Sequence, residues 1–299
     1  GLRFKALFSY KNYNKTTTSR SQGINRYTLT GYTQNADGSY SLNISPFGSS
    51  NPSKPVLSTT SSVAGDRRIY FQSYVDYMNK FGNHNVSGML LWNIDQYDNN
   101  APGNLVASLP RRKMGFAGRL SYDYDNRYMF EVNAGYNGSE NFAKGHKWGF
   151  FPSVAVGWNV SQENFFEPLK DVISNLKLRA SYGLVGNDQL LDSSGGLIRF
   201  IYMSDITLQS GNAGFTTGDK QQITLNGPVY TRYQNNDLTW EVGEKLNVGF
   251  DMQLFNSLNV TVDAFREIRR DIFQQRYSIP NYLGTASTAV YGNLAKVKN

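Results

Sequence analysis

Apolar and polar residues alternate along several segments of the chain. Between Leu2 and Tyr10 every second residue is apolar or aromatic. The same period of two returns at 69–77, 116–122, 128–136, 176–182, 248–254 and 258–262. This period is typical of β-strands that place one face in an apolar environment. The intervening positions are charged or carry amides, as at Glu131 and Asn133. The pattern therefore predicts an all-β protein.

The predicted strands are long. Many run for about ten residues or more, close to the roughly 9–11 residues that a tilted strand needs to cross a membrane. Strands of soluble proteins average about 5–6 residues. We count about eleven such segments, which favours a transmembrane antiparallel β-barrel with polar side chains facing a wet lumen. The alternative is a soluble β-rich binding domain, which would not need detergent.

Long and short connections alternate between these strands. The short ones are 80–83, 123–126 and 255–257, and the long ones are 11–66, 95–111, 137–147, 185–241 and 271–288. Outer-membrane barrels have short periplasmic turns and longer extracellular loops, so the alternation predicts an orientation. The connection 161–175 is long but falls on the short side by parity, and the spacing of Phe165, Leu169 and Val172 predicts a short helix there. Within 11–66, the run from Asn35 to Ser39 predicts a hairpin turn.

Composition agrees with a membrane wall. Charged residues make up 18% of the chain, against roughly 25% in soluble domains, while aromatics reach 14% and the mean hydropathy is −0.48. The net charge of +7 raises nucleic-acid binding as an alternative. The basic residues are scattered, however, and the tightest groups, 111–113 and Arg266 with Arg269 and Arg270, lie near predicted strand ends. We therefore interpret them as solvated rims or contacts with anionic lipid headgroups.

Several longer motifs resemble one family. They are WGFFPSVAVGW at 148–158, ISNLKLRASYG at 173–183 followed by VGN at 185–187, FGNHNVS at 81–87, LTWE at 238–241, NVGFD at 247–251 and the final strand-like run at 292–299. In order and spacing these motifs resemble SusC-like (SusC/RagA-type) TonB-dependent outer-membrane transporters. The chain departs from the family at 136–142, where a DGSS-type hairpin is usual.

The resemblance implies an active importer of glycans or oligopeptides in the bacterial outer membrane. Such an importer is energised by TonB and works with a SusD-like surface lipoprotein, without a cofactor. It also implies an N-terminal plug and a 22-stranded barrel. We find no plug motif in this segment, and both ends interrupt strand-like sequence. We therefore expect residues 1–299 to be a partial receptor barrel domain, about half of the wall, completed by barrel and plug segments outside this chain. The alternative within the same architecture is a siderophore or cobalamin receptor.

Candidate ligand contacts are aromatic residues in the expected outer loops, namely Tyr32, Tyr97, Tyr230 and Tyr233. The four tryptophans, Trp92, Trp148, Trp158 and Trp240, are mostly expected in aromatic belts at the membrane interfaces. Asp95 and Asp98 belong to an oxygen-rich cluster that a calcium ion could use, but the glycine and distal glutamate of a calcium loop are absent, so a plain polar loop is preferred.

Catalysis finds no support in the sequence. His84 falls at a short turn and His146 in a long loop, on opposite sides of the membrane, so the two cannot serve one nucleophile or one metal. An outer-membrane barrel enzyme would need a Ser/His pair on one face, and we expect neither catalytic residues nor enzyme activity.

Overall fold

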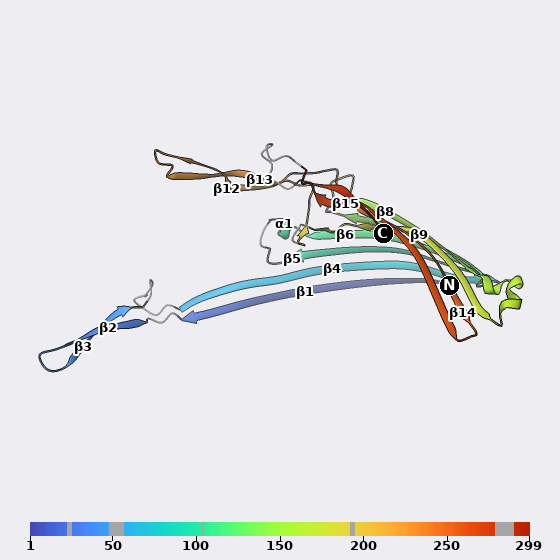
Figure 1. The fold of residues 1–299 in the computed structure, drawn as a ribbon, viewed down its shortest axis with the longest axis horizontal. Coiled ribbons are helices and arrows are strands. Elements are labelled where there is room, and N and C mark those ends of the chain that lie inside the picture. The colour runs from blue at the N-terminus through green and yellow to red at the C-terminus, as the bar shows by residue number, and fades with distance from the viewer. Residues whose placement is uncertain (23–25, 48–56, 103–104, 192–194, 279–289) are drawn as a thin grey trace.

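A single curved antiparallel sheet dominates the structure (Figure 1). The computed structural model describes residues 1–22, 26–47, 57–102, 105–191, 195–278 and 290–299. The strands lie in the order β1-β4-β5-β6-β7-β8-β9-β14-β15-β16. Their bounds are Leu2–Gln22 (β1), Leu57–Phe81 (β4), His84–Asn99 (β5), Arg111–Tyr124 (β6), Tyr128–Ser139 (β7), Trp148–Asn159 (β8), Ile173–Asn187 (β9), Glu241–Leu254 (β14), Leu258–Gln275 (β15) and Tyr291–Lys298 (β16). The all-β, antiparallel prediction is confirmed.

The main sheet has one strand fewer than the sequence pattern predicts. The main sheet has ten strands in the described part of the chain, not about eleven. The further strands lie inside the long connections and pair only with each other, as β2–β3, β10–β11 and β12–β13. They add nothing to the wall, because none of these pairs is joined to a strand of the main sheet in the described part of the chain.

The register places apolar and polar residues on opposite faces. Val132 lies opposite Leu120 on one neighbouring strand and Val154 on the other. Its sequence neighbour Asn133 lies opposite Arg119 and Ser153. The apolar face leaves large side chains open, with Leu90 72% and Phe150 59% exposed. Because such a face would be unstable in water, we assign it to the lipid and the polar face to the lumen.

Aromatic rings form two bands on the apolar face. Towards one end of the sheet, Trp92 packs near Phe116, and Trp148 stacks on Tyr136 with centroids 4.7 Å apart. Towards the other end lie Tyr122, Tyr124, Tyr128 and Trp158. Tyr128 and Tyr136 bound one strand segment of about 27 Å, at roughly 3.4 Å per residue. At a strand tilt of about 40° that length spans roughly 20 Å along the barrel axis, somewhat less than the apolar band of about 25 Å that the rings flank.

One end of the sheet has short connections. The turns after Phe81, Tyr124 and Leu254 are tight hairpins. Asp125 and Asn126 both adopt positive φ, 55° and 54°, which short Asp and Asn side chains tolerate best. The predicted short helix at 161–175 is present as two 3-10 helices, η1 (Val160–Gln162) and η2 (Asn164–Leu169).

The opposite end contains the other long connections, and here the predicted boundaries are wrong. The expected loop 11–66 is largely strand, because β1 and β4 continue to Gln22 and from Leu57. Its Thr- and Ser-rich sequence, with β-branched threonines, pairs well but is polar on both faces, so no alternation marks it. The hairpin predicted at Asn35–Ser39 is confirmed by a backbone bond of 2.8 Å from Asn35 N–H to the Ser39 carbonyl, between β2 (Tyr27–Gln34) and β3 (Tyr40–Pro46).

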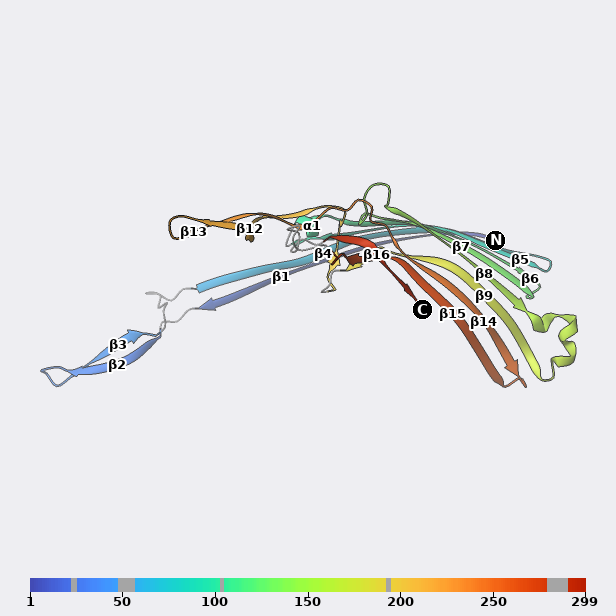
Figure 2. The same cartoon turned by 45° about the horizontal axis from the view of Figure 1, so that its top comes forward.

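The expected loop 185–241 also contains regular structure. Its elements are β10 (Leu190–Leu191), β11 (Leu197–Ile198), β12 (Asp205–Thr217) and β13 (Ile223–Arg232). A four-residue helix, α1 (Leu105–Ser108), lies in the expected loop 95–111. Hairpins β2–β3 and β12–β13 both project beyond the sheet at this end (Figure 2). Among the described residues, no helix reaches the length and apolarity that a membrane crossing requires.

Candidate functional site

The polar face of the sheet is a ladder of paired charges and amides. The Glu131 carboxylate accepts hydrogen bonds from the Ser121 hydroxyl at 2.9 Å and from the Asn133 amide at 2.8 Å. Further along the same face, the Arg179 guanidinium bridges Asp251 at 3.2 Å and Asp263 at 2.7 Å. Ser121–Glu131 and Arg179–Asp251 join neighbouring strands and Arg179–Asp263 reaches one strand further, so the wall presents fixed polar groups towards the lumen.

The ladder continues to the end with the long connections. Arg68 forms an ion pair with Asp95 at 2.7 Å, and the Arg111 guanidinium lies 5.1 Å from the centroid of the Tyr97 ring. In the strand register Tyr97 lies opposite both Arg68 and Arg111. An aromatic ring held beneath a guanidinium, beside further charges, offers stacking and hydrogen-bonding groups to a polar ligand.

The other candidate tyrosines lie in the projecting hairpins. Tyr230 and Tyr233 stack with centroids 5.2 Å apart and an interplanar angle of 22°. Tyr32 contacts Tyr40 edge-on at 5.5 Å and is 69% exposed. The structure thus brings Tyr230 and Tyr233 together, whereas Tyr32 and Tyr97 lie at separate positions. The four are not one platform.

The oxygen cluster is divided between two faces. Asp98 is paired with Arg67 at 2.9 Å on the apolar side of the register, while Asp95 is paired with Arg68 on the polar side. Among the described residues, no group of three or more His, Cys, Asp or Glu side chains is placed to hold a metal ion. His84 lies at the short end and His146 in the β7–β8 connection at the long end, as the pattern predicts.

A buried apolar cluster on the lumen side was missed by the sequence pattern. Phe142, Leu190, Ile201, Leu238 and Trp240 form its core, and Phe151, Ile198, Phe273 and Tyr291 pack against it. Trp240 is only 9% exposed and its indole N–H donates to the Lys147 carbonyl at 3.3 Å, so it is not a belt residue. The cluster joins parts of the β7–β8 and β9–β14 connections to wall strands, a long-range packing that no local period reports.

Gly149 and Gly186 make room for this cluster. A Cβ at Gly149 would lie 2.4 Å from the Phe151 ring, and one at Gly186 would lie 1.9 Å from it. The Phe151 ring can therefore lie flat across the wall, between two strands, and reach Trp240 at a centroid distance of 5.3 Å. The conspicuous glycines of the 148–158 and 185–187 motifs were the available signal for this packing.

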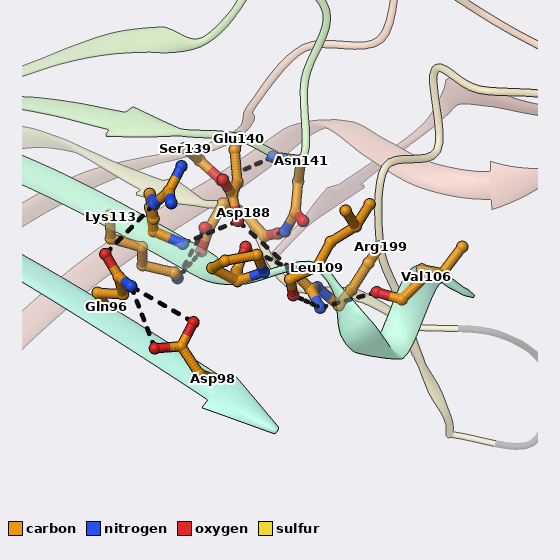
Figure 3. A network of polar contacts seen from close by, with 12 residues as sticks. Gln96, Asp98, Val106, Leu109, Lys113, Ser139, Glu140, Asn141, Asp188 and Arg199 are labelled. Atoms are coloured by element: carbon orange, nitrogen blue, oxygen red, sulfur yellow. Dashed lines mark hydrogen bonds and ion pairs between the residues drawn. The ribbon is translucent and has the colours of Figure 1, made fainter. Parts of the chain in front are cut away.

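Arg199 connects the segment that follows β11 to neighbouring segments (Figure 3). Its guanidinium donates to the carbonyls of Val106 (3.1 Å), Leu109 (2.9 Å) and Pro110 (3.0 Å), and pairs with Glu140 at 3.4 Å. Burial lowers the pKa of Arg199 from its ordinary value, and the attraction of Glu140 opposes that shift. Nearby, Lys113 pairs with the largely buried Asp188 at 2.7 Å, and the Asn141 amide donates to the Asp188 carbonyl.

Comparison with known proteins assigns this architecture. The family model described as "TonB dependent receptor-like, beta-barrel" matches residues 1–299. The chain belongs to this family. TonB-dependent receptors of this family are β-barrels of the bacterial outer membrane, which confirms the predicted fold, family and location. Because outer-membrane barrels have their longer loops outside, we expect the end with the projecting hairpins to be the extracellular one.

Individual relatives agree. TonB-dependent receptor P3 of Formosa agariphila is 29% identical over 241 residues, which are 72% of this chain and 22% of that protein. TonB-dependent receptor SusC of Bacteroides thetaiotaomicron is 32% identical over 143 residues, 48% of this chain and 13% of SusC. The structure of the RagAB peptide transporter matches all of this chain with a TM-score of 0.67 at 18% identity, over 31% of its own chain, which shows the shared fold. The chain thus spans less than a quarter of the length of these curated relatives.

Proposed function

We propose that residues 1–299 are about half of the barrel wall of a TonB-energised importer for oligosaccharides or oligopeptides, without enzyme activity. Ten wall strands are close to half of a 22-stranded barrel. The observation that supports transport best is the charged and amide-bearing face, which runs from the short-turn end to the extracellular rim. A wide polar lumen suits a polar, hydrated cargo. The likeness to SusC and to the fold of the RagAB peptide transporter supports the two substrate classes.

The inferred ligand contacts lie at the extracellular rim. Tyr97 beneath Arg111 on the wall and the stacked pair Tyr230–Tyr233 on the β12–β13 hairpin present aromatic surface beside charged and hydrogen-bonding groups. Sugar rings and peptide side chains both bind such surfaces, because each combines apolar faces with polar edges.

The inferred partner is a SusD-like surface lipoprotein. One face of the β2–β3 hairpin gathers Tyr27, Leu29, Tyr32, Tyr40, Leu42 and Ile44, all between 52% and 69% exposed. A register shift between Leu29 and Gly31 keeps Tyr32 in phase with Leu29, so the apolar residues stay on one face. The β1–β4 ribbon holds this hairpin well beyond the apolar band, where lipid cannot cover it (Figure 1). A protein surface is the occupant that such a patch suits.

Isolation of the tagged full-length receptor from its own outer membrane tests the partner. We expect a surface lipoprotein to co-purify with the wild type and to be lost when Tyr32 and Leu42 are both replaced by serine. Replacement of Thr33 and Ser41 by alanine on the opposite face is the control and should retain it. A receptor that purifies without any lipoprotein, in each of these forms, would contradict the proposed partnership.

Uptake by a strain that depends on this receptor tests the cargo. We expect import of an oligosaccharide or oligopeptide, reduced at low substrate concentration by Tyr97→Ala and by Tyr230→Ala with Tyr233→Ala. Tyr10→Ala, on the lipid face, is the matched control and should import normally. Uptake of a ferric siderophore or cobalamin instead would favour the alternative receptor class.

A further inference from the structure

The lipid face of β8, β9, β14 and β15 contains a row of small side chains. Val156, Ala180, Val248 and Ala264 lie opposite one another across the four strands. The next row towards the short-turn end is larger, with Trp158, Leu178, Phe250 and Val262. Both rows line a groove of about 840 Å³ on this face. A volume of this size is within the range of ligand pockets, roughly 300–1,000 Å³.

A polar pocket begins where the apolar groove ends. One row further towards the extracellular end, Tyr182 and Arg266 flank Leu246 in the register. These three residues, with Glu244 and Ile268, line a second cavity of about 90 Å³. The Tyr182 hydroxyl donates to Glu244 at 2.8 Å. Along β9, β14 and β15 this face is therefore apolar towards the short-turn end and polar towards the extracellular end.

Three cations beside this pocket form no ion pair within the described part of the chain, although the Glu244 carboxylate lies on the same face, opposite Ile268 in the register. Arg266 and Arg270 lie two residues to either side of Ile268 on β15, and Lys298 lies opposite Ile268 on β16. The side chains of Arg266, Arg270 and Lys298 are all exposed.

On the lumen face of the same strands several cations are paired. Arg179 binds two aspartates, Lys245 lies 3.9 Å from Glu267, and Arg269 pairs with Glu241. On these strands Arg179, Lys245 and Arg269 of the inner face are thus paired with carboxylates, whereas Arg266 and Arg270 of the outer face are available.

The depth of Arg266 places it at a membrane interface. It lies eight residues beyond Leu258, the first residue of β15, as Tyr136 lies eight residues beyond Tyr128, the first residue of β7. Tyr136 belongs to the extracellular aromatic band, so Arg266 is level with the headgroups of the outer leaflet, and Arg270 lies further out. The groove below is then level with the acyl chains.

We propose that this face binds an anionic, phosphate-bearing lipid of the outer leaflet, with an acyl chain along the Ala180–Ala264 row and its phosphate between Arg266 and Arg270. Guanidinium groups bind phosphate oxygens through paired, charge-assisted hydrogen bonds. The small side chains admit the acyl chain, and the bulky row below ends the groove. The inference rests on the barrel wall alone and holds whatever the receptor imports.

Lipid retention by the purified full-length receptor tests the site. After delipidation in detergent, the receptor is mixed with phosphatidylglycerol or phosphatidylcholine of identical acyl chains, and bound lipids are counted by native mass spectrometry. We expect the wild type to prefer phosphatidylglycerol. Each arginine should contribute about fivefold to that preference, so Arg266→Gln combined with Arg270→Gln should abolish it. Arg119→Gln with Lys177→Gln, on the lumen face, removes the same charge and should keep the preference.

Two further measurements separate the parts of the site. Ala264→Phe fills the groove with an apolar ring and should lower retention of both lipids, while the receptor still folds. Millimolar inorganic phosphate should not displace the bound lipid. The proposal would be overturned if the wild type retained the two lipids equally, or if the lumen-face control also lost the preference for phosphatidylglycerol. Full lipid retention by Ala264→Phe, or displacement of the lipid by phosphate alone, would overturn it too.

Discussion

At the scale of single residues, the position of a side chain in the strand alternation determines whether it meets lipid or water. Val132 lies between Leu120 and Val154 on the apolar face, and Asn133 donates to Glu131 on the polar face. Neighbours in sequence therefore face different solvents. This difference was readable from the alternation of 128–136 alone, because the side chains of a strand repeat every two residues.

An arginine scan of these two positions tests the assignment. Val132→Arg should destabilise the full-length receptor by about 2–4 kcal/mol, because it places a charge near the middle of the bilayer, whereas Asn133→Arg should be mild. The free energy of unfolding in lipid vesicles, measured by urea titration, checks this. Equal destabilisation by the two substitutions would show that the faces are assigned wrongly.

At the scale of elements, the long connections fold back on the wall through one arginine and one apolar cluster. Arg199, whose side chain is 14% exposed, joins the segment after β11 to carbonyls in and just after α1 and to Glu140 beyond β7. Ile201 and Leu190 insert beside Trp240. The segment is thus held by buried charge and apolar packing together, and loss of either would release it.

Removal of Arg199 should loosen this end of the barrel. Arg199→Ala leaves three carbonyls and Glu140 without their shared donor, so we expect several-fold faster hydrogen exchange in 139–147 and 187–201. Arg232→Ala, which removes a single bond from a guanidinium on β13 to the Met203 carbonyl, is the control. Unchanged exchange in Arg199→Ala would mean that the apolar cluster alone holds the segment.

Local sequence patterns predict some of these elements and miss others. The wall strands and the hairpin at Asn35–Ser39 were predictable, because period two and turn residues are local signals. The polar extension of β1 and β4 was not, since Thr and Ser occupy both faces there. Trp240 departs from the belt position that the sequence predicts for most tryptophans, because it is buried against Phe142 of the β7–β8 connection and residues far from it in its own connection. Tyr230 and Tyr233 were predictable as loop aromatics, but their stacking depends on the β12–β13 hairpin.

At the scale of the whole molecule, the alternation of short and long connections gives the sheet two different ends. The short turns, at 82–83, 125–127 and 255–257, lie at one end, and the projecting hairpins β2–β3 and β12–β13 lie at the other (Figure 2). In an outer-membrane barrel the second end is extracellular. The rim tyrosines and the proposed partner surface both depend on this orientation.

Cysteine labelling tests the orientation most directly, because the chain has no cysteine of its own. Asp37→Cys lies in the β2–β3 turn and Asn126→Cys in the β6–β7 turn. In intact cells that make the full-length receptor, a membrane-impermeant maleimide should label Asp37→Cys at once and Asn126→Cys only after the outer membrane is permeabilised. Labelling of Asn126→Cys but not Asp37→Cys in intact cells, or recovery of the receptor in the soluble fraction, would contradict the account.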